Sequence, residues 1–308
     1  MVKPVYIDPM TDFGFKRIFA SESNKELLIT FLNELFKGSK QVVDLSYDKN
    51  EFVGDTEGMG SVILDLTCKG STGERFLIEI QTSSQVNFKK RILYYGSKLI
   101  ADQAPKGNRK SWGYDISEVY VIVLMDGFRL SARESKKDYL HSACICNRQT
   151  GEVFNEDIQY IFIELINFTK GEAELTDDLD KWLYVLKNMS SMEKLPVYFS
   201  QPIFEKLFQI AEYSKLNKEE KLMYDISQKR KWDKKVVLDF ARKEGMEKGL
   251  KDGLKKGRHE GIEEGSEKKA YEVVKNLIAE LNLSDDAIVR IANVNLEFVQ
   301  KLRNSLKK

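Results

Sequence analysis

Two acidic residues in neighbouring apolar runs are the part of the sequence that could do chemistry. Asp65 lies in the run SVILDLTC and Glu79 in the run RFLIEIQT, and the breaker-rich segment KGSTG separates them. These runs predict two β-strands joined by a short turn. If the hairpin is symmetric about Thr72, residues whose numbers sum to 144 face each other, and the Cβ atoms of Asp65 and Glu79 lie about 5 Å apart. Gln81 then shares their face, because side chains alternate along a strand.

Facing carboxylates need something that offsets their repulsion. Like charges opposite each other destabilise a sheet, and the apolar neighbours of Asp65 and Glu79 reduce the hydration of both groups. A hard divalent cation, Mg²⁺ or Mn²⁺, would turn the pair into a binding site, because such cations prefer oxygen ligands. The alternative is that both acids lie on the solvent face of an edge hairpin and never meet.

Three blocks of residues, in this order, resemble a known family. They are TDFGFKRIF near the start, Asp65 followed after thirteen residues by Glu79-Ile80-Gln81, and RILYYGSKLIADQ on the next predicted helix. The acid spacing resembles the PD-(D/E)XK nuclease core, with Gln81 where the commoner pattern has lysine. The blocks together are similar to the recombination-promoting nuclease family, whose members are also described as transposases. The resemblance extends from about residue 8 to about residue 188.

The resemblance implies a metal-dependent DNA endonuclease that hydrolyses phosphodiester bonds and is linked to recombination or mobile elements. Asp65 and Glu79 would bind Mg²⁺ or Mn²⁺ together with the backbone carbonyl of Ile80, and Gln81 would orient the attacking water. Glutamine cannot act as a general base in the way a lysine amine can. Two other classes therefore stay open, a catalytically silent DNA-binding protein and an oligomerising scaffold.

Basic residues near these blocks are the candidates for contacting DNA. The helix predicted over residues 86–103 carries Lys90, Arg91 and Lys98, and Lys90 or Arg91 could replace the missing lysine at the scissile phosphate. The resemblance places DFGFKRIF beside the active centre, where Lys16 would touch a phosphate. The alternative is that these are ordinary solvated charges. Three acidic residues before the hairpin, Glu51, Asp55 and Glu57, could supply a further metal ligand. The alternative is that they are solvated loop acids.

The pattern of the remaining runs predicts an α/β fold, a restriction-endonuclease-like mixed sheet flanked by helices and followed by an all-helical C-terminal extension. The run VYVIVLM at 119–125 predicts a central strand, because it is apolar throughout. Further helices are predicted over 12–19, 24–36 and 175–189, the last with Thr176 as N-cap, and further strands over 41–53, 139–146 and 160–165.

Composition limits the classes of function. With 49 basic and 48 acidic residues the net charge is +1, so any DNA contact must be a local patch. Three cysteines and two distant histidines exclude a disulfide framework and argue against histidine-based metal or triad chemistry. No segment approaches the ~20 apolar residues of a membrane helix, and no signal peptide is evident, so we expect a soluble cytoplasmic protein with no membrane partner.

Beyond residue 190 the strand patterns stop. We expect a nuclease domain over 1–190, a helical connector over 191–240, a glycine repeat over 241–269 and a small helical tail over 270–308. Six glycines recur at every fourth position from Gly245 to Gly265 and form a stripe beside Met246, Leu250, Leu254 and Ile262. Each costs about 1 kcal/mol inside a helix, which a closely packed partner helix would offset.

We therefore expect a homo-oligomer through this helix, most simply a homodimer, and the alternative is a flexible charged tether. In the tail, helices are expected near Ala270, after Ser284 and after Asn295. Their spacing is typical of a helix-turn-helix. The final helix, with Gln300, Lys301, Arg303 and Asn304, would then read DNA, or else the tail is a packing cap.

Overall fold

The computed structural model of the chain describes residues 4–48, 51–52, 62–105, 112–130, 138–281 and 283–306. They form two compact units, Met1–Val236 and Val237–Lys308, and we describe each by itself. The loop acids Asp55 and Glu57 lie outside the described residues, and so does the side chain of Glu51. Among the described residues, no helix combines the length and the apolar composition that crossing a membrane requires.

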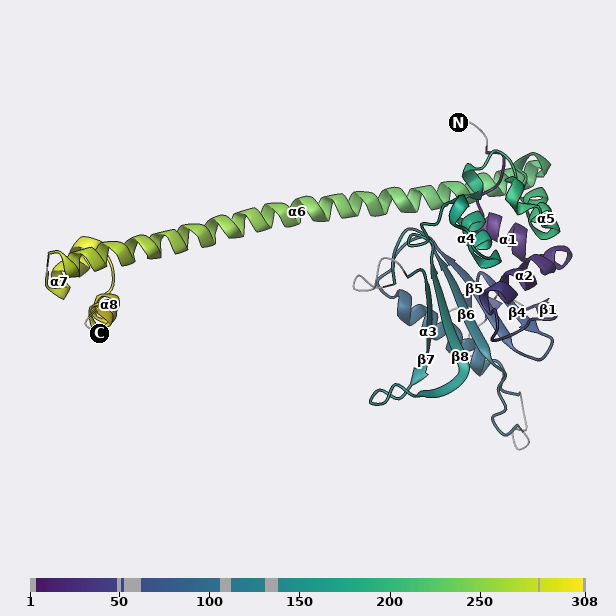
Figure 1. Ribbon diagram of the computed structural model, residues 1–308, viewed down its shortest axis with the longest axis horizontal. Helices are drawn as coiled ribbons and strands as arrows, with labels where there is room; N and C mark the ends of the chain where they lie inside the picture. Colours follow the sequence, from purple (N-terminus) through teal and green to yellow (C-terminus); the bar gives the residue numbers. More distant parts are fainter. Residues whose placement is uncertain are drawn as a thin grey trace. The chain divides into compact units, whose positions relative to one another are not determined.

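A six-stranded mixed sheet is the centre of the first unit (Figure 1). Strands β5, β6 and β8 run parallel, and the remaining pairs are antiparallel. The all-apolar strand β6 lies inside the sheet and is buried along its whole length, which confirms the predicted central strand. In sheet order the strands are β1 (Leu45–Tyr47), β4 (Leu66–Gly70), β5 (Arg75–Gln81), β6 (Val119–Met125), β8 (Val153–Glu164) and β7 (Leu140–Cys146).

Helices cover both faces of this sheet (Figure 1). One face packs on α1 (Asp12–Phe19), α2 (Lys25–Leu35), α4 (Asp178–Asn188) and α5 (Pro202–Ala211) in the larger apolar core, and the other packs on α3 (Phe88–Ala101) in the smaller one. The structure thus has the predicted restriction-endonuclease-like architecture, a mixed sheet between helices. A separate pair, β2 (Glu51–Phe52) and β3 (Val62–Ile63), lies outside the main sheet.

Two predicted strands have different limits in the structure. The strand expected over residues 41–53 forms only β1, three residues long, and then β2, which pairs with β3 instead of joining the main sheet. Strand β8 begins at Val153 and not at Tyr160, because its exposed first half pairs with β7 across the turn at 147–151. That half has no continuous apolar pattern, so hydrogen bonding and not burial defines it as strand.

The predicted N-cap of the helix at 175–189 was wrong by one residue. Helix α4 begins at Asp178, and the side chain of Asp177 accepts a hydrogen bond from the backbone N–H of Asp180. The hydroxyl of Thr176 instead donates to the Asp180 carboxylate, which also pairs with Lys170. A carboxylate at the N-cap accepts an otherwise unpaired N–H and faces the positive end of the helix dipole.

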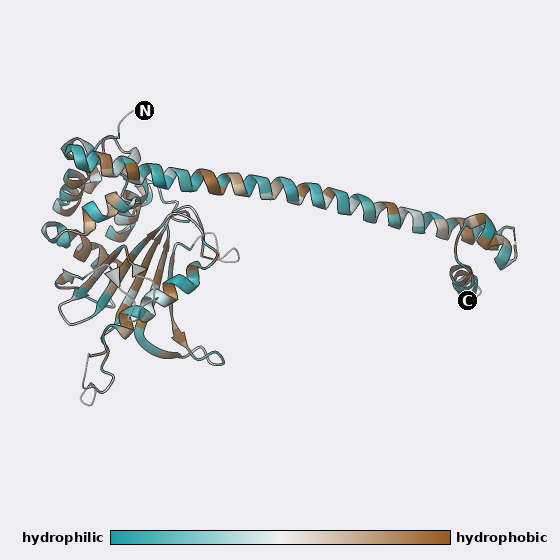
Figure 2. Ribbon diagram, turned by 180° about the vertical axis from the view of Figure 1, so that it is seen from behind, coloured by the Kyte–Doolittle hydropathy of each residue, from teal (hydrophilic) through white to brown (hydrophobic). Residues whose placement is uncertain are grey.

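The second unit is helical and contains the rest of α6 (Lys218–Ala279), α7 (Asp285–Ala292) and α8 (Leu296–Leu306). Val274, Ile288, Val299 and Leu302 form its small core. The helices predicted after Ser284 and after Asn295 are present as α7 and α8. The separate helix expected to begin near Ala270 was wrong, because α6 continues without a break through this position. The glycine repeat belongs to α6 and is helical throughout. The residues along this stretch are mostly hydrophilic, as the ribbon colours of Figure 2 show.

Candidate active site

The β4–β5 hairpin brings the two predicted acids together. Its four backbone pairs run from Leu66–Ile78 to Lys69–Arg75, which confirms the register predicted from symmetry about Thr72. Asp65 directly precedes β4, and its backbone N–H donates to Oε1 of Glu79 at 3.1 Å. The backbone N–H of Ile80 donates to Oδ2 of Asp65 at 2.8 Å. The alternative in which the acids never meet is therefore wrong.

Burial makes this acid pair expensive to ionise. Glu79 is 5% exposed, and desolvation, followed by the nearby charge of Asp65, raises its pKa to about 8. Desolvation also raises the pKa of Asp65, against the stabilising hydrogen bond from Ile80. At neutral pH the pair therefore tends to hold a proton that a bound cation would displace.

Two positive side chains face the acid pair. The positive charges of Arg91 on α3 and Lys16 on α1 act to lower the pKa values of both carboxyls. They partly oppose the larger effect of desolvation, which raises these pKa values. Arg91 also donates from Nη2 to Oε1 of Gln81 and from Nη1 to Oε1 of Gln85. Lys16 forms an ion pair with Asp12 at 2.7 Å. The two residues reach the site from elements on opposite faces of the sheet.

The other two predicted DNA-contacting residues lie elsewhere on α3. Lys90 is exposed, and the ammonium of Lys98 lies 6.0 Å from the ring centroid of Tyr94. In the described part of the chain, neither lysine shifts the pKa of Asp65 or Glu79. Of the two residues considered as substitutes for the missing lysine, the structure thus brings Arg91 to the site and leaves Lys90 outside it.

Sequence reasoning missed two residues of the site. Tyr95 was not among the predicted site residues, but burial and the charge of Glu79 raise the pKa of the Tyr95 hydroxyl, and the Arg91 guanidinium lies 5.7 Å from its ring centroid. The available signal was the i, i+4 spacing of Arg91 and Tyr95, which places them on one face of a helix. Asp12 was read only as part of a helix start, although its charge raises the pKa of Asp65.

Helix α1 is placed by unusually close packing. A Cβ on Gly14 would lie 2.0 Å from the carbonyl oxygen of Asp8, so only glycine fits there. The Thr11 hydroxyl caps the helix by accepting from the backbone N–H of Gly14 at 3.0 Å. On the outer side, the backbone N–H of Phe13 donates to Oγ of Ser227 in α6 at 3.2 Å. The glycine in the TDFGF block therefore serves the geometry of the site.

A partly buried lysine joins α6 to the same frame. Nζ of Lys231 lies 2.9 Å from Oδ2 of Asp8 and 3.1 Å from Oδ2 of Asp126. The backbone N–H of Asp126 donates to the carbonyl of Gln81 at 2.9 Å. Lys231 thus links the segment before α1 to the ends of β5 and β6, directly beside the acid pair.

The donor set of the site fits one hard divalent cation. Asp65 and Glu79 supply carboxylate oxygens from opposite strands, and within the described residues no group of three or more His, Cys, Asp or Glu side chains could hold a metal ion. Mg²⁺ is commonly bound by one or two carboxylates, with waters and substrate phosphate completing its shell. The arrangement suits such a partly hydrated ion and is unlike a closed protein cage.

Comparisons with known proteins identify the family of the chain. The family model described as "PD-(D/E)XK nuclease family transposase" matches residues 9–241, a span that contains Asp65, Glu79, Gln81 and Arg91. Comparisons with curated proteins and with solved structures gave no match. Because the family model covers most of the chain, and the three sequence blocks meet in one site of the expected fold, the protein belongs to the PD-(D/E)XK nuclease family transposases.

Proposed function

We propose that the protein is a divalent-metal-dependent DNA endonuclease whose active centre is the Asp65–Glu79 pair. The observation that carries this proposal is the burial of two opposed carboxylates with raised pKa values, in a chain of a nuclease family. Such a pair is costly unless it has a role that requires it. The link to recombination or mobile elements follows from the transposase description of the family.

Asp65, Glu79 and the backbone carbonyl of Ile80 would hold the cation, Mg²⁺ or Mn²⁺. The N–H of Ile80 points to Asp65, and the N–H and C=O of one strand residue point to the same edge. The Ile80 carbonyl is thereby directed to the side of the strand on which Asp65 lies. A bound ion would polarise the scissile phosphate and lower the pKa of a coordinated water.

Gln81 holds Arg91 in this proposal. Its amide nitrogen donates to the carbonyl of Ser83 at 2.8 Å and its amide oxygen accepts from Arg91, so both of its polar groups are engaged within the protein. Nε of Arg91 is buried and has no hydrogen-bond partner among the described residues. Nη1 and Nη2 of Arg91 each carry a second N–H, which can donate to a phosphate oxygen and stabilise its developing charge. Lys16 supplies a second positive charge from α1.

Nicking of supercoiled plasmid tests this function. With Mg²⁺ or Mn²⁺, wild-type protein should nick the plasmid, and Asp65→Asn and Glu79→Gln should lower the rate by at least about a hundredfold, since each removes a charged ligand. Glu205→Gln, an exposed substitution on α5, is the matched control and should nick like wild type. Equal cleavage by wild type and both site variants would show that the activity does not reside at this pair.

We also propose that the glycine-repeat helix, residues 245–265 of α6, pairs with a second copy of itself in an antiparallel arrangement. The apolar side chains beside the glycines, Met246, Leu250, Leu254 and Ile262, are 61% to 76% exposed. The first part of the repeat is basic and the last part acidic, with Lys251, Lys255 and Arg258 followed by Glu260, Glu263 and Glu267. An antiparallel copy would place each half against its opposite charge.

Charge reversal tests this pairing. Wild-type chain should have a dimeric mass by light scattering at micromolar concentration, and Lys255→Glu should weaken dimerisation by about tenfold. Combining Lys255→Glu with Glu263→Lys should restore it, because the two positions face each other in the proposed dimer. A monomeric wild-type mass, or no rescue by the double variant, would contradict the arrangement.

A further inference from the structure

A cavity of about 450 Å³ lies at the end of the β4–β5 hairpin farthest from the acid pair. Lys69 and Arg75, which face each other across the two strands, contribute to its wall. Side chains alternate along a strand, so these two share the sheet face of Asp65 and Glu79. Arg75 and Glu79 are four positions apart on β5, which corresponds to about 13 Å along the strand. This is the length of about four nucleotides along one strand of a duplex.

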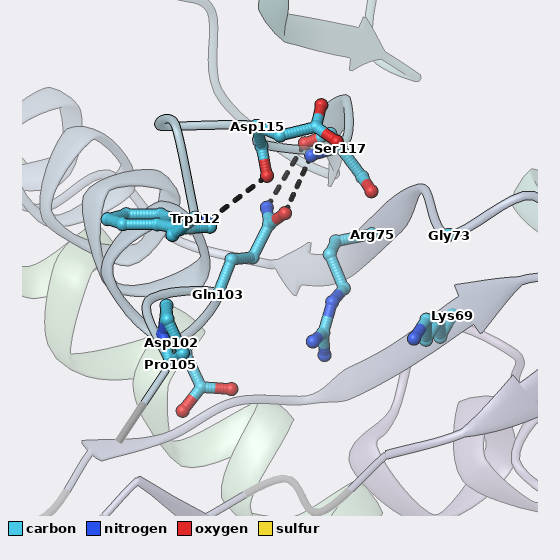
Figure 3. Close-up of a pocket in the computed structure, with 9 residues that line it drawn as sticks. All are labelled: Lys69, Gly73, Arg75, Asp102, Gln103, Pro105, Trp112, Asp115 and Ser117. Carbon is cyan, nitrogen blue, oxygen red and sulfur yellow. Dashed lines mark hydrogen bonds between the residues drawn. The ribbon is translucent and has the colours of Figure 1, made fainter. Parts of the chain in front are cut away.

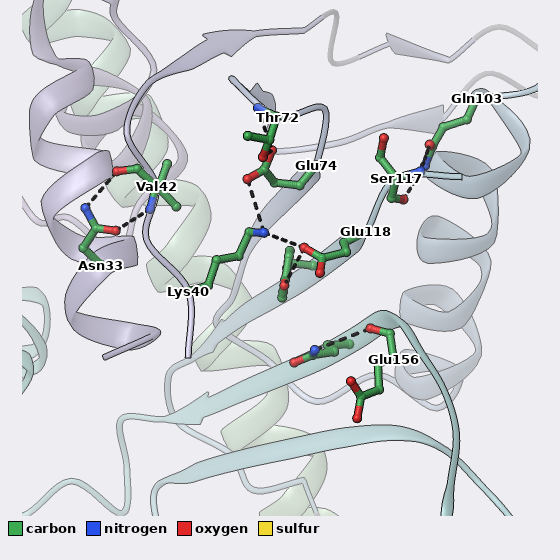
Figure 4. A network of polar contacts seen from close by, with 11 residues as sticks. Asn33, Lys40, Val42, Thr72, Glu74, Gln103, Ser117, Glu118 and Glu156 are labelled. Atoms are coloured by element: carbon green, nitrogen blue, oxygen red, sulfur yellow. Dashed lines mark hydrogen bonds and ion pairs between the residues drawn. The ribbon is translucent and has the colours of Figure 1, made fainter. Parts of the chain in front are cut away.

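The cavity presents positive charge that the protein does not fully neutralise. Nη1 of Arg75 is paired with Asp48 at 2.7 Å, which leaves the other guanidinium N–H groups for a ligand. Lys69 is exposed and forms no ion pair within the described residues. Nearby Lys40 is different, because it lies between Glu74 and Glu118 and its charge is compensated (Figure 4).

An aromatic ring stands across the cavity from these cations (Figure 3). The indole Nε1–H of Trp112 donates to the carbonyl of Asp115 at 3.2 Å, and the Tyr114 ring centroid is 5.1 Å from that of Trp112. The adjoining wall is fixed by Gln103 and Ser117, whose two mutual hydrogen bonds measure 2.7 and 3.1 Å. A held aromatic ring beside lysine and arginine is the combination that binds single nucleotides, by stacking and by charge.

Two carboxylates determine which kind of anion the cavity can bind. Asp102 and Asp115 also line the cavity, and Figure 3 shows Asp102 on the same side as Trp112. They would repel a bare phosphate, but a carboxylate accepts hydrogen bonds from the exocyclic amino group of a nucleobase. A nucleotide satisfies both ends, with its phosphate near the cations and its base near the carboxylates.

We propose that this cavity binds one nucleotide of a DNA strand, with its base stacked on Trp112, its phosphate on Lys69 and Arg75, and its amino group facing Asp102. That the nucleotide belongs to a DNA substrate rests on the proposed nuclease function. The cavity would hold a nucleotide outside the cleavage centre, on the same sheet face, and so help to fix where the strand is cut. Its volume lies within the range of ordinary ligand pockets.

Calorimetric titration of the full chain with 2′-deoxyadenosine 5′-monophosphate tests the cavity in EDTA, where no metal-dependent cleavage can occur. Trp112→Leu and Lys69→Gln should each weaken binding by about tenfold, the size expected for a lost base stack or phosphate contact. Thymidine 5′-monophosphate, which lacks the amino group, should bind more weakly than the adenine nucleotide. Inorganic phosphate should give no measurable heat.

Matched controls separate the cavity from general surface effects. Trp232→Leu replaces an exposed tryptophan on α6, and Lys37→Gln replaces an exposed lysine, and both should bind the nucleotide like wild type. Trp112→Phe keeps a stacking ring and should retain most of the affinity even if Trp112→Leu fails to fold. Absence of nucleotide binding, wild-type affinity in both Lys69→Gln and Trp112→Leu, or phosphate binding as tight as that of the nucleotide would overturn the proposal.

The two proposals fail in different ways. Asp65→Asn and Glu79→Gln should bind the nucleotide like wild type, since neither residue lines the cavity. Nucleotide binding without plasmid nicking would overturn the nuclease proposal and support the cavity. Metal-dependent nicking without nucleotide binding would overturn the cavity and leave the nuclease proposal intact.

Discussion

The acid pair and the glycine repeat both contain residues that lower the stability of the fold, buried carboxylates in the first and glycines within a helix in the second. The two regions differ in what surrounds these residues. At the acid pair, backbone N–H groups donate to the two carboxylates, and the positive charges of Arg91 and Lys16 act to lower their pKa values. In the repeat, an added Cβ on any glycine from Gly245 to Gly265 would meet nothing within 4 Å. The chain itself therefore supports the first region, whereas nothing in the described part of the chain packs on the glycines of the second.

Replacing Arg91 should have the largest effect of the changes considered, and it should affect the acid pair but not the glycine repeat. Arg91→Gln removes the charged donor that binds the amide oxygen of Gln81, and we expect plasmid nicking to slow by about a hundredfold or more, as for loss of a donor to transition-state charge. Dimerisation through α6 should be unchanged. Nicking rates and light scattering on the same preparations measure both effects.

Lys90→Gln is the matched control, because it removes a positive charge one residue away on the same helix. Lys90 is exposed and outside the site, so its variant should nick within about threefold of wild type. If the two variants are equally impaired, general attraction of DNA to α3, and not contact at the acid pair, explains the role of the positive charge.

The pH dependence of metal binding should sharpen the picture of the acid pair. Because the pKa of Glu79 is raised to about 8, the metal-free folded chain keeps the proton below this pH, and the metal must displace it. Affinity for Mn²⁺ should therefore fall by about tenfold for each pH unit below 8, as expected when one proton is released. Titration calorimetry between pH 6 and pH 8.5 would measure this slope.

Stability should change with pH in the opposite sense. A carboxyl with a raised pKa in the folded state favours folding while it is protonated, and this contribution is lost as the pH rises from the ordinary glutamate pKa of 4.5 through about 8. Glu79→Gln, which has no proton to lose, should therefore gain stability relative to metal-free wild type over that window. If the free energies of unfolding of Glu79→Gln and metal-free wild type differ by the same amount at every pH, the result would contradict the raised pKa of Glu79.

Glycine replacement should give the smallest effect and test the other region. Gly253→Ala should stabilise the helix of the monomer by about 1 kcal/mol, because alanine is the better helix former and has open space there. If a second copy packs on the stripe, the same change should weaken dimerisation. Thermal unfolding measures the change in stability, and light scattering measures the change in dimerisation. Lys256→Ala, which introduces an alanine at a non-glycine position of the same helix, is the control.

The acid pair could be predicted from sequence because local rules determine it. A short turn and strict alternation set the register of the hairpin, so the contact of Asp65 with Glu79 followed from numbering alone. The family resemblance then directed attention to Lys16 and Arg91. Choosing Arg91 over Lys90 required the direction in which α3 presents each side chain, which depends on how the helix rests on the sheet.

The frame of the site could not be predicted, because long-range packing creates it. Lys231 reaches Asp8 across a sequence separation of 223, and Ser227 reaches Phe13 across 214. No periodicity or cap signal encodes such pairs. The misplaced N-cap on α4 has a related cause, since Asp180 draws Thr176 into a buried network that the local pattern does not contain.

The Lys231 link has a practical consequence for working with this protein. A fragment that stops at residue 190, the end of the nuclease domain expected from the sequence, would keep every residue of the acid pair but leave Asp8 and Asp126 without their cation. Removing one partner from a partly buried ion pair is unfavourable, because the remaining charge is left uncompensated. The shortest piece that should preserve the arrangement around Gln81 therefore extends through Lys231.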